Sequence, residues 1–238
     1  MEALILAGGL GTRLSPYTAI LPKPLMPVGQ MPILELIIRQ LQYSGIDHVT
    51  LAVSYLGTLL QAYFGDGSRL GVKIDYQWED HPLGTAGAIS LFNPEEDDFL
   101  VMNGDILTTL NYQALFSAHK SKKSLATIAS FEKQVKIDLG VLEIDEQGTL
   151  LDYVEKPIKT YMVSMGINVF NKKVLEYLKA EDHIDIPELM LLLKNKGERI
   201  YCYSEPCEWY DIGRVEDFTM AQQLVQERLD QFLPGGSK

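Results

Sequence analysis

The stretch Leu4-Ile5-Leu6-Ala7-Gly8-Gly9-Leu10-Gly11-Thr12-Arg13-Leu14 joins an apolar segment to a glycine-rich loop that carries one arginine. The segment Pro22-Lys23-Pro24 follows shortly afterwards. Glycine has no Cβ, so the backbone N–H groups of such a loop can close around phosphate oxygens. Arg13 and Lys23 place positive charge beside the same loop. We interpret the stretch as a strand that ends in a polyphosphate-binding loop.

Two common phosphate-binding motifs do not fit this loop. The P-loop requires Gly, four residues and then Gly-Lys-Ser/Thr, and that string is absent. The dinucleotide fingerprint would start at Gly9 and Gly11 but meets Leu14 where it needs a third glycine. Pro16 also interrupts the helix that this fingerprint requires, and no acidic residue near Val53 is placed to hold a ribose. A glycine-rich turn without a ligand is the remaining alternative.

The run from Leu6 to Val28 resembles the signature of the sugar nucleotidyltransferases, also called NDP-sugar pyrophosphorylases. The family pattern L-A-G-G-x-G-T-R-L-x-P-x-T starts at Leu6, and P-K-P-L-x-P-V starts at Pro22. The resemblance continues to about residue 218. It implies an α/β fold of the nucleotide-diphospho-sugar transferase type, with a Rossmann-like, mixed and mostly parallel sheet flanked by helices.

Composition narrows the class of protein further. The chain has 238 residues, is 46% apolar and has a formal net charge of −11, which argues against a nucleic-acid-binding surface. It contains neither a run of 18 apolar residues nor a signal-peptide pattern, so we expect no membrane partner. The two cysteines, Cys202 and Cys207, form no metal-ligand pattern. We therefore expect a cytoplasmic location.

The first half of the chain alternates predicted strands and helices, which favours a parallel sheet with right-handed crossovers. The strands are Ala3–Ala7, His48–Val53, Val72–Trp78 and Phe99–Met102, and one helix opens at Met31 and ends at Gly45. The other helices are Leu59–Phe64, Gly84–Phe92 and Asn111–Ser121.

The second half is richer in strands, predicted at Leu125–Phe131, Gly140–Ile144, Leu151–Glu155, Met162–Phe170 and Arg199–Tyr203. Helices are predicted near Lys173–Leu178, Ile186–Lys196 and Val215–Phe232. We find no linker or repeat and expect one domain over 1–238. Residues 1–110 would form its nucleotide-binding half, and residues 111–232 its sugar-phosphate-binding half.

Two acidic residues are candidate ligands of Mg²⁺. Asp105 follows the predicted strand Phe99–Met102, and ligands of open α/β sheets bind outside the carboxyl ends of strands. Asp105 could also serve only as a strand-end cap. The resemblance implies that Asp105, in the pair Gly104-Asp105, and Asp211, in Trp209-Tyr210-Asp211-Ile212-Gly213, are the metal-binding acids of the family. Two carboxylates with bridging phosphates are a normal environment for Mg²⁺.

The base of the nucleotide is expected near Glu79, because the segment Pro82–Ala88 is similar to the family element P-L-G-T-A-G-A beside the base. A carboxylate only accepts hydrogen bonds, and guanine offers two adjacent donors, so Glu79 tilts the prediction toward GTP. A solvated Glu at a strand end is an equally common arrangement. The predicted nucleotide-binding residues are Leu6, Ala7, Gly8, Gly9, Gly11, Thr12, Glu79, Pro82, Gly84, Thr85 and Asn103.

The predicted sugar-phosphate-binding residues are Gly140, Glu155, Lys156 and Asn168. Glu155-Lys156-Pro157 is similar to the family's E-K-P, whose charged pair contacts the sugar and its phosphate. A surface ion pair of neighbours is the alternative. Asn168 alternates with apolar residues and is the predicted reader of a sugar hydroxyl, although the family often has other residues there.

The reaction implied is NTP plus sugar 1-phosphate giving NDP-sugar plus pyrophosphate, with Arg13 and Lys23 as the catalytic residues. Removing either is expected to lower turnover far more than stability. The chain most resembles short mannose-1-phosphate guanylyltransferase-like members, so we favour GTP with mannose 1-phosphate or a related hexose or heptose phosphate. The alternatives are a dTTP- or UTP-dependent glucose-1-phosphate nucleotidyltransferase and a non-catalytic, nucleotide-sensing regulatory homologue. A homo-oligomer is compatible with the sequence.

Overall fold

The computed structural model describes residues 1–238 apart from 10, 15–16, 55, 181, 214 and 234–238. The α-helices among the described residues are α1 (Ile33–Tyr43), α2 (Gly57–Phe64), α3 (Gly84–Ser90), α4 (Tyr112–Lys122), α5 (Ile186–Asn195) and α6 (Val215–Phe232). None of them is long and apolar enough to cross a bilayer.

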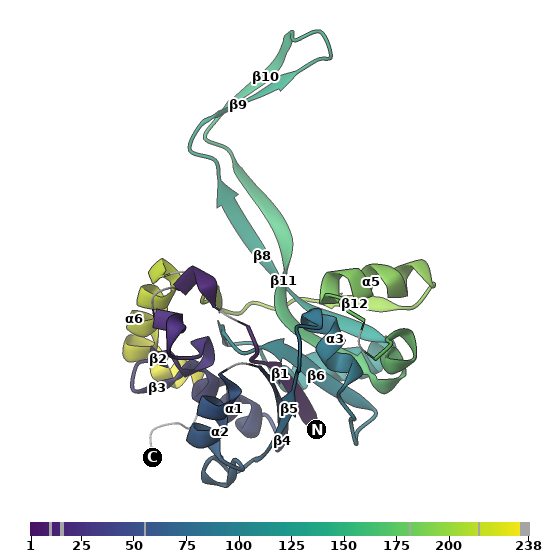
Figure 1. The fold of residues 1–238 in the computed structure, drawn as a ribbon. Coiled ribbons are helices and arrows are strands. Elements are labelled where there is room, and N and C mark those ends of the chain that lie inside the picture. The colour runs from purple at the N-terminus through teal and green to yellow at the C-terminus, as the bar shows by residue number, and fades with distance from the viewer. Residues whose placement is uncertain (10, 15–16, 55, 181, 214, 234–238) are drawn as a thin grey trace.

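A seven-stranded sheet forms the centre of the molecule (Figure 1), in the order β12-β8-β11-β6-β1-β4-β5. Its strands are β1 (Glu2–Leu6), β4 (His48–Val53), β5 (Lys73–Trp78), β6 (Asp98–Asn103), β8 (Ala126–Lys136), β11 (Ile158–Asn171) and β12 (Ile200–Tyr203). The strand β11 is antiparallel to both of its neighbours, and every other pair in this sheet is parallel. The predicted mixed, mostly parallel sheet is confirmed.

The side chains of β1 point alternately to the two faces of the sheet, which explains why helices cover both faces. Ala3 and Ile5 belong to a buried cluster that includes residues of α1, α2, α4 and α6. Leu4 points to the opposite face and belongs to a second cluster with α3 and α5. Successive strand residues point to opposite faces, so one apolar strand serves two cores.

Short pairs of strands lie outside the main sheet. They are β2 (Pro27–Val28) with β3 (Met31–Pro32), β7 (Ile106–Thr108) with β13 (Trp209–Asp211), and β9 (Gly140–Ile144) with β10 (Leu150–Glu155). The pair β7–β13 is absent from the prediction. It connects the end of β6 to the segment before α6, and so it determines where Asp211 lies.

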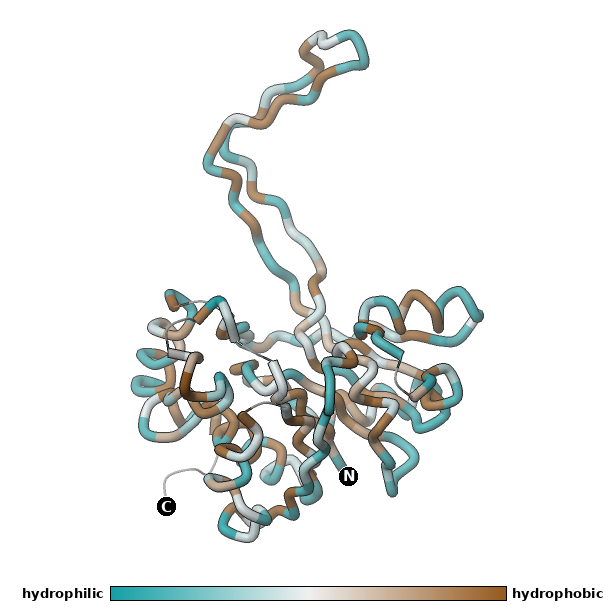
Figure 2. The backbone as a smooth tube through the Cα atoms, viewed as in Figure 1, coloured by the Kyte–Doolittle hydropathy of each residue, from teal (hydrophilic) through white to brown (hydrophobic). Residues whose placement is uncertain are grey.

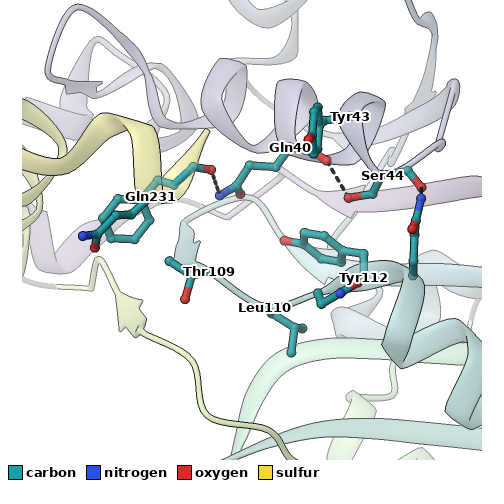
Figure 3. A pocket seen from close by; sticks show the side chains of 10 residues that line it. Gln40, Tyr43, Ser44, Thr109, Leu110, Tyr112 and Gln231 are labelled. Carbon is teal, nitrogen blue, oxygen red and sulfur yellow. Dashed lines mark hydrogen bonds between the residues drawn. The ribbon is translucent and has the colours of Figure 1, made fainter. Parts of the chain in front are cut away.

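The C-terminal helix returns to the nucleotide half of the chain. Gln40 of α1 donates hydrogen bonds to the carbonyls of Thr108 (2.8 Å) and Phe232 (2.6 Å). Figure 3 shows Gln40 reaching from α1 toward the end of α6, beside a cavity of about 260 Å³. None of the predicted site residues lines that cavity.

The strands β8 and β11 continue beyond the predicted ends at Phe131 and Met162, and they leave the body as a two-stranded ribbon that carries β9 and β10 at its far end (Figure 1). We call residues 132–163 the arm. Most of its residues are exposed and none is buried.

Candidate active site

The glycine-rich loop begins where β1 ends, beside β4 and β6. The Ala7 amide donates to the carbonyl of Ala52 (2.9 Å), and the carbonyl of Leu6 accepts from the Gly104 amide (3.0 Å). The hydroxyl of Ser54 donates to the Gly8 carbonyl at 2.6 Å. These bonds hold the loop at the carboxyl end of three adjacent strands, which is where the sequence predicts the polyphosphate.

Gly11 shows why the loop needs glycine. Its φ is +60°, a conformation that favours glycine, and a Cβ there would lie 2.9 Å from the Thr18 methyl carbon. The Thr18 hydroxyl donates to the Gly11 carbonyl at 2.8 Å. A cavity of about 250 Å³ opens beside this loop and is lined by Gly8, Gly9 and Thr12 among others. Leu10, Ser15 and Pro16 of the motif lie outside the described residues.

Lys23 and Asp105 form a salt bridge at the centre of the site. The lysine lies in a short 3-10 turn between Pro22 and Pro24, and only 9% of it is exposed. Breaking a buried ion pair from one side costs about 3–5 kcal/mol. We therefore expect removal of Lys23 to cost stability as well as turnover, because it would break this pairing, which the sequence did not predict.

Asp211 lies beside Asp105 because of the β7–β13 ladder. Asp211 pairs in register with Ile106, and the Ile212 amide donates to the Asp105 carbonyl at 3.2 Å. Burial and then the neighbouring Asp105 carboxylate raise the pKa of Asp211, while Lys23 and Arg13 act in the opposite direction. The two predicted acids are thus brought together, with two cations close enough to influence them.

The chemistry of this pair fits a divalent cation. The Oδ1 atom of Asp105 is buried and has no hydrogen-bond partner. A cation between two carboxylates would satisfy that oxygen and remove the repulsion that raises the Asp211 pKa. No cluster of three or more His, Cys, Asp or Glu side chains suited to a metal occurs in the described part of the chain. The remaining ligands would therefore have to come from substrate phosphates and water.

Arg13 projects from the 3-10 turn Thr12–Leu14 toward Asp211. A Cβ built on Gly213 would lie 3.1 Å from Arg13 Nη1, so the guanidinium lies against the backbone that follows Asp211. Arg13 is exposed and lines a cavity of about 490 Å³ together with Asp211 and Lys133. This is the open position that a charge-neutralising group needs.

Lys133 is a cation of this cavity that the sequence analysis missed. Its Nζ lies 5.8 Å from the centre of the Trp209 ring, and the Phe131 ring packs against the same ring at a tilt, with the two ring centres 5.6 Å apart. Trp209 is also held by its indole N–H, which donates to the Met165 carbonyl at 3.0 Å. No motif marks Lys133. The one available signal was the W-x-D-x-G element, which places an aromatic ring beside the second acid.

Asn168, the predicted reader of a sugar hydroxyl, is buried with its side-chain amide unpaired. It is 1% exposed, and neither its Oδ1 nor its Nδ2 has a hydrogen-bond partner. It lines a cavity of about 310 Å³ together with Thr85, Asn103 and Asp211. Buried amides are normally paired, so a polar molecule in this cavity would complete the hydrogen bonds of Asn168.

The predicted base-binding residues are held by a segment that the sequence analysis did not single out. Asp185 Oδ1 accepts from the Thr85 amide (2.8 Å) and from its hydroxyl (3.0 Å). Gly84 has a φ of +78°, and a Cβ there would lie 2.5 Å from the Ile184 carbonyl oxygen. Pro82 precedes this turn and is exposed. Glu79 directly follows β5, and its backbone amide donates to the Val53 carbonyl at 3.1 Å. Burial raises the pKa of the Glu79 carboxyl group.

Three predicted residues lie apart from all the others. Gly140 begins β9, Glu155 ends β10, and Lys156 follows at the junction with β11, so all three belong to the arm. Lys156 Nζ and Glu155 Oε1 are 3.8 Å apart, and both side chains are more than half exposed. The arm leads away from the glycine-rich loop (Figure 1), so the structure does not bring these residues to Arg13 and Asp211.

The chain is similar to known proteins over most of its length. A family model described as nucleotidyl transferase matches residues 2–228. The chain is 34% identical to a UTP–glucose-1-phosphate uridylyltransferase of Synechocystis, over 96% of this chain and 64% of that protein. It is 32% identical to a mannose-1-phosphate guanylyltransferase of Mycobacterium tuberculosis, over 92% of this chain and 62% of that protein. The chain thus spans less than two thirds of the length of either protein.

Among solved structures, the chain is similar to HddC from Yersinia pseudotuberculosis. The TM-score is 0.74 with 28% identity, over 93% of this chain and 98% of that one. A second structure of HddC contains GMP-PN, and its TM-score is 0.71 with 27% identity.

Proposed function

The chain belongs to the nucleotidyl transferase family, and on that premise we propose that it transfers a nucleotidyl group from an NTP to a sugar 1-phosphate. A phosphate oxygen of the sugar phosphate attacks the α-phosphorus, and the bond from that phosphorus to the β-phosphate oxygen breaks. The products are an NDP-sugar and pyrophosphate. The observation that carries the proposal is the convergence of Arg13, Lys23, Asp105 and Asp211 at the glycine-rich loop.

The attacking group is already an anion, so the reaction requires no general base and no covalent intermediate. The chain has to align two polyanions and stabilise the charge that develops at the α-phosphorus. The backbone from Gly8 to Thr12 would hold the triphosphate. Arg13 and Lys23 would neutralise the α-phosphate and the leaving pyrophosphate.

Asp105 and Asp211 would hold Mg²⁺, for which the unpartnered Asp105 oxygen and the raised Asp211 pKa are the supporting observations. When bound, the ion would supply positive charge that polarises the phosphates of the NTP. Asp105 would then have two roles, because its other oxygen fixes the Nζ of Lys23.

The substrates proposed are GTP and mannose 1-phosphate or a related hexose or heptose phosphate. Glu79 supports guanine, because one carboxylate can accept from two adjacent donors of that base. The likeness to a guanylyltransferase and to a GMP-PN complex agrees with this choice. The uridylyltransferase likeness keeps a UTP- or dTTP-dependent glucose-1-phosphate enzyme as the second candidate. A cytoplasmic location is proposed because Cys202 and Cys207 are free thiols.

A screen of four NTPs against several sugar 1-phosphates, with Mg²⁺ and detection of pyrophosphate, tests this proposal. We expect the highest kcat/KM with GTP. Glu79→Gln should lower kcat/KM for GTP about tenfold or more, since a site built for hydrogen bonds discriminates through them, and should leave UTP nearly unaffected. A wild-type preference for UTP or dTTP would establish the second candidate. Nucleotide binding without pyrophosphate release from any pair would indicate a regulatory homologue.

Asn168→Leu is expected to separate function from stability. Each buried polar group without a partner costs about 1–3 kcal/mol, so the variant should unfold at a higher temperature than the wild type when no ligand is present. The KM for the sugar phosphate should rise about tenfold or more, with the KM for the NTP unchanged. Thermal unfolding and initial rates measure both effects. Gln113→Ala, in the cavity of Figure 3, is the control. Reduced stability with unchanged KM would give Asn168 a purely structural role.

A further inference from the structure

The arm, residues 132–163, exposes an apolar surface that the body does not cover. Figure 2 shows hydrophobic residues continuing along the ribbon to its tip. On the hairpin β9–β10, Leu142 pairs with Tyr153 and Ile144 pairs with Leu150, so these four side chains share one face. Each of them is 54–58% exposed.

Apolar side chains are exposed along the whole arm. Besides these four, they are Val135, Leu139, Leu151, Val154, Ile158, Tyr161 and Met162, each 40–73% exposed. Contiguous exposed apolar surface often marks a site of interaction with another protein. A two-stranded ribbon is also only marginally stable in water without a third strand or a packed face. The arm therefore requires a surface to pack against.

The same face of the hairpin carries Glu155, one of the predicted sugar-phosphate-binding residues. Gly140 pairs with Glu155 two positions along from the pair Leu142–Tyr153, so Glu155 lies on the apolar face. Lys156 follows directly. A surface that covers this apolar face would also contact Glu155. Because Glu155 is predicted to bind the sugar phosphate, we take that surface to be the catalytic cleft, the cavities lined by Arg13, Asp211 and Asn168.

The length of the arm favours the cleft of another molecule. The roughly ten residues from Phe131 to Gly140 span about 30 Å at ~3.3 Å per residue. A compact chain of this length has a radius of gyration of about 18 Å. The arm points away from the body (Figure 1), and its base at Lys133 lines the same cavity as Arg13. The tip is therefore far enough from its own body to reach a neighbouring molecule of the same size.

We propose that two copies of this chain exchange arms, so that each arm crosses the partner's catalytic cleft and brings Glu155 and Lys156 to its sugar-phosphate side. This inference rests on the proposed function and on the sugar-phosphate-binding roles that the sequence predicts for these two residues. A symmetric exchange covers both arms at once and closes the assembly as a dimer. Obligate homodimer interfaces are more apolar than other interfaces, and the exposed apolar side chains of two exchanged arms have that character.

In the assembled site, the chemistry would be divided between two chains. The body supplies Arg13, Lys23, Asp105, Asp211 and Asn168 for the triphosphate, the cation and the sugar. The partner's arm supplies an ammonium group for the phosphate of the sugar phosphate and a carboxylate that accepts from its hydroxyl groups. Each site is incomplete without the second copy.

Complementation between two inactive variants tests the exchange. Arg13→Ala disables the body and Lys156→Ala disables the arm, and both side chains are exposed, so both variants should fold. Each is expected to lose at least about tenfold in kcat/KM as a homodimer. The two chains are coexpressed with different affinity tags, and the heterodimer is purified through both tags. It should regain about half of the wild-type activity per dimer, because one of its two sites combines an intact body with an intact arm.

The contrary results are equally definite. A heterodimer that stays as inactive as its parents would show that each arm serves its own body. Failure to capture any heterodimer, or full activity of Lys156→Ala alone, would also overturn the proposal.

A second measurement does not depend on activity. Sedimentation should find a dimer for the wild type and a monomer for the folded double variant Leu142→Lys, Ile144→Lys. A monomeric wild type, or a dimeric double variant, would contradict the exchange. A wild type that dimerises through its arm but transfers no nucleotide would instead refute the proposed function alone.

Discussion

Arg13→Ala is expected to lower kcat by about 10²–10³-fold, the cost typical of removing one group that stabilises charge in the transition state. The guanidinium lies beside Asp211 in an open cavity, where it can contact a phosphate that acquires charge during the reaction. The side chain is exposed, and exposed substitutions usually change stability by less than about 0.5 kcal/mol. The thermal unfolding temperature should therefore remain nearly unchanged.

Steady-state kinetics and thermal unfolding of the same preparations make this test. Arg199→Ala is the matched control, because Arg199 is exposed and bonds the Lys122 carbonyl outside the site. A kcat of Arg13→Ala equal to that of the wild type would remove this residue from the catalytic machinery. If Arg13→Ala were much less stable than the wild type, its lower activity would be explained by unfolding and not by the loss of a catalytic group.

Asp211→Asn is expected to abolish cation-dependent turnover and yet to stabilise the free protein. The loss of activity should be at least about 10²-fold, because one of two proposed carboxylate ligands becomes neutral. The gain in stability follows from the raised pKa of Asp211, since the folded state disfavours its ionised form.

The sign of the pH dependence follows from the same shift. A carboxyl group whose pKa is higher in the folded state favours folding in its protonated form, and this contribution is lost as the pH rises through the raised value. Asp211→Asn should therefore unfold at a higher temperature than the wild type at neutral pH, with the difference shrinking toward the ordinary pKa of 3.8. Thermal unfolding without added cation from pH 3 to pH 8 measures this. A less stable variant at neutral pH would contradict the account.

Mg²⁺ should stabilise the wild type and not the variant. It should raise the unfolding temperature of the wild type, because an ion bound only by the folded state stabilises that state. It should have little effect on Asp211→Asn. An equal effect on both proteins would place the cation elsewhere.

The parts of the site that the sequence predicted are those encoded by consecutive residues at strand ends. The loop Gly8–Arg13, the turn around Lys23 and the pair Gly104-Asp105 each follow from a short motif and the rule that ligands lie at the carboxyl ends of strands. The order of strands and helices in the first half of the chain was also predictable, from hydrophobic periodicity. Apolar strands alternate there with amphipathic helices, so both periodicities are visible in the sequence.

The remaining parts depend on contacts between distant segments. The salt bridge of Lys23 with Asp105, the position of Lys133 against Trp209 and the contact of Asp185 with Thr85 are set by packing that no local pattern encodes. The arm is the largest example. Its strands were partly predicted, but where Glu155 and Lys156 lie depends on how the ribbon leaves the sheet.

The central claim is that nucleotidyl transfer to a sugar 1-phosphate occurs at the loop Gly8–Arg13. Phosphorus NMR of the purified protein with GTP, Mg²⁺ and mannose 1-phosphate tests it most directly, because substrates and products are resolved in one spectrum. We expect pyrophosphate and an NDP-sugar to form in equal amounts, and both to form about 10²–10³-fold more slowly with Arg13→Ala. No product with any NTP and sugar 1-phosphate, or pyrophosphate without an NDP-sugar, would contradict it.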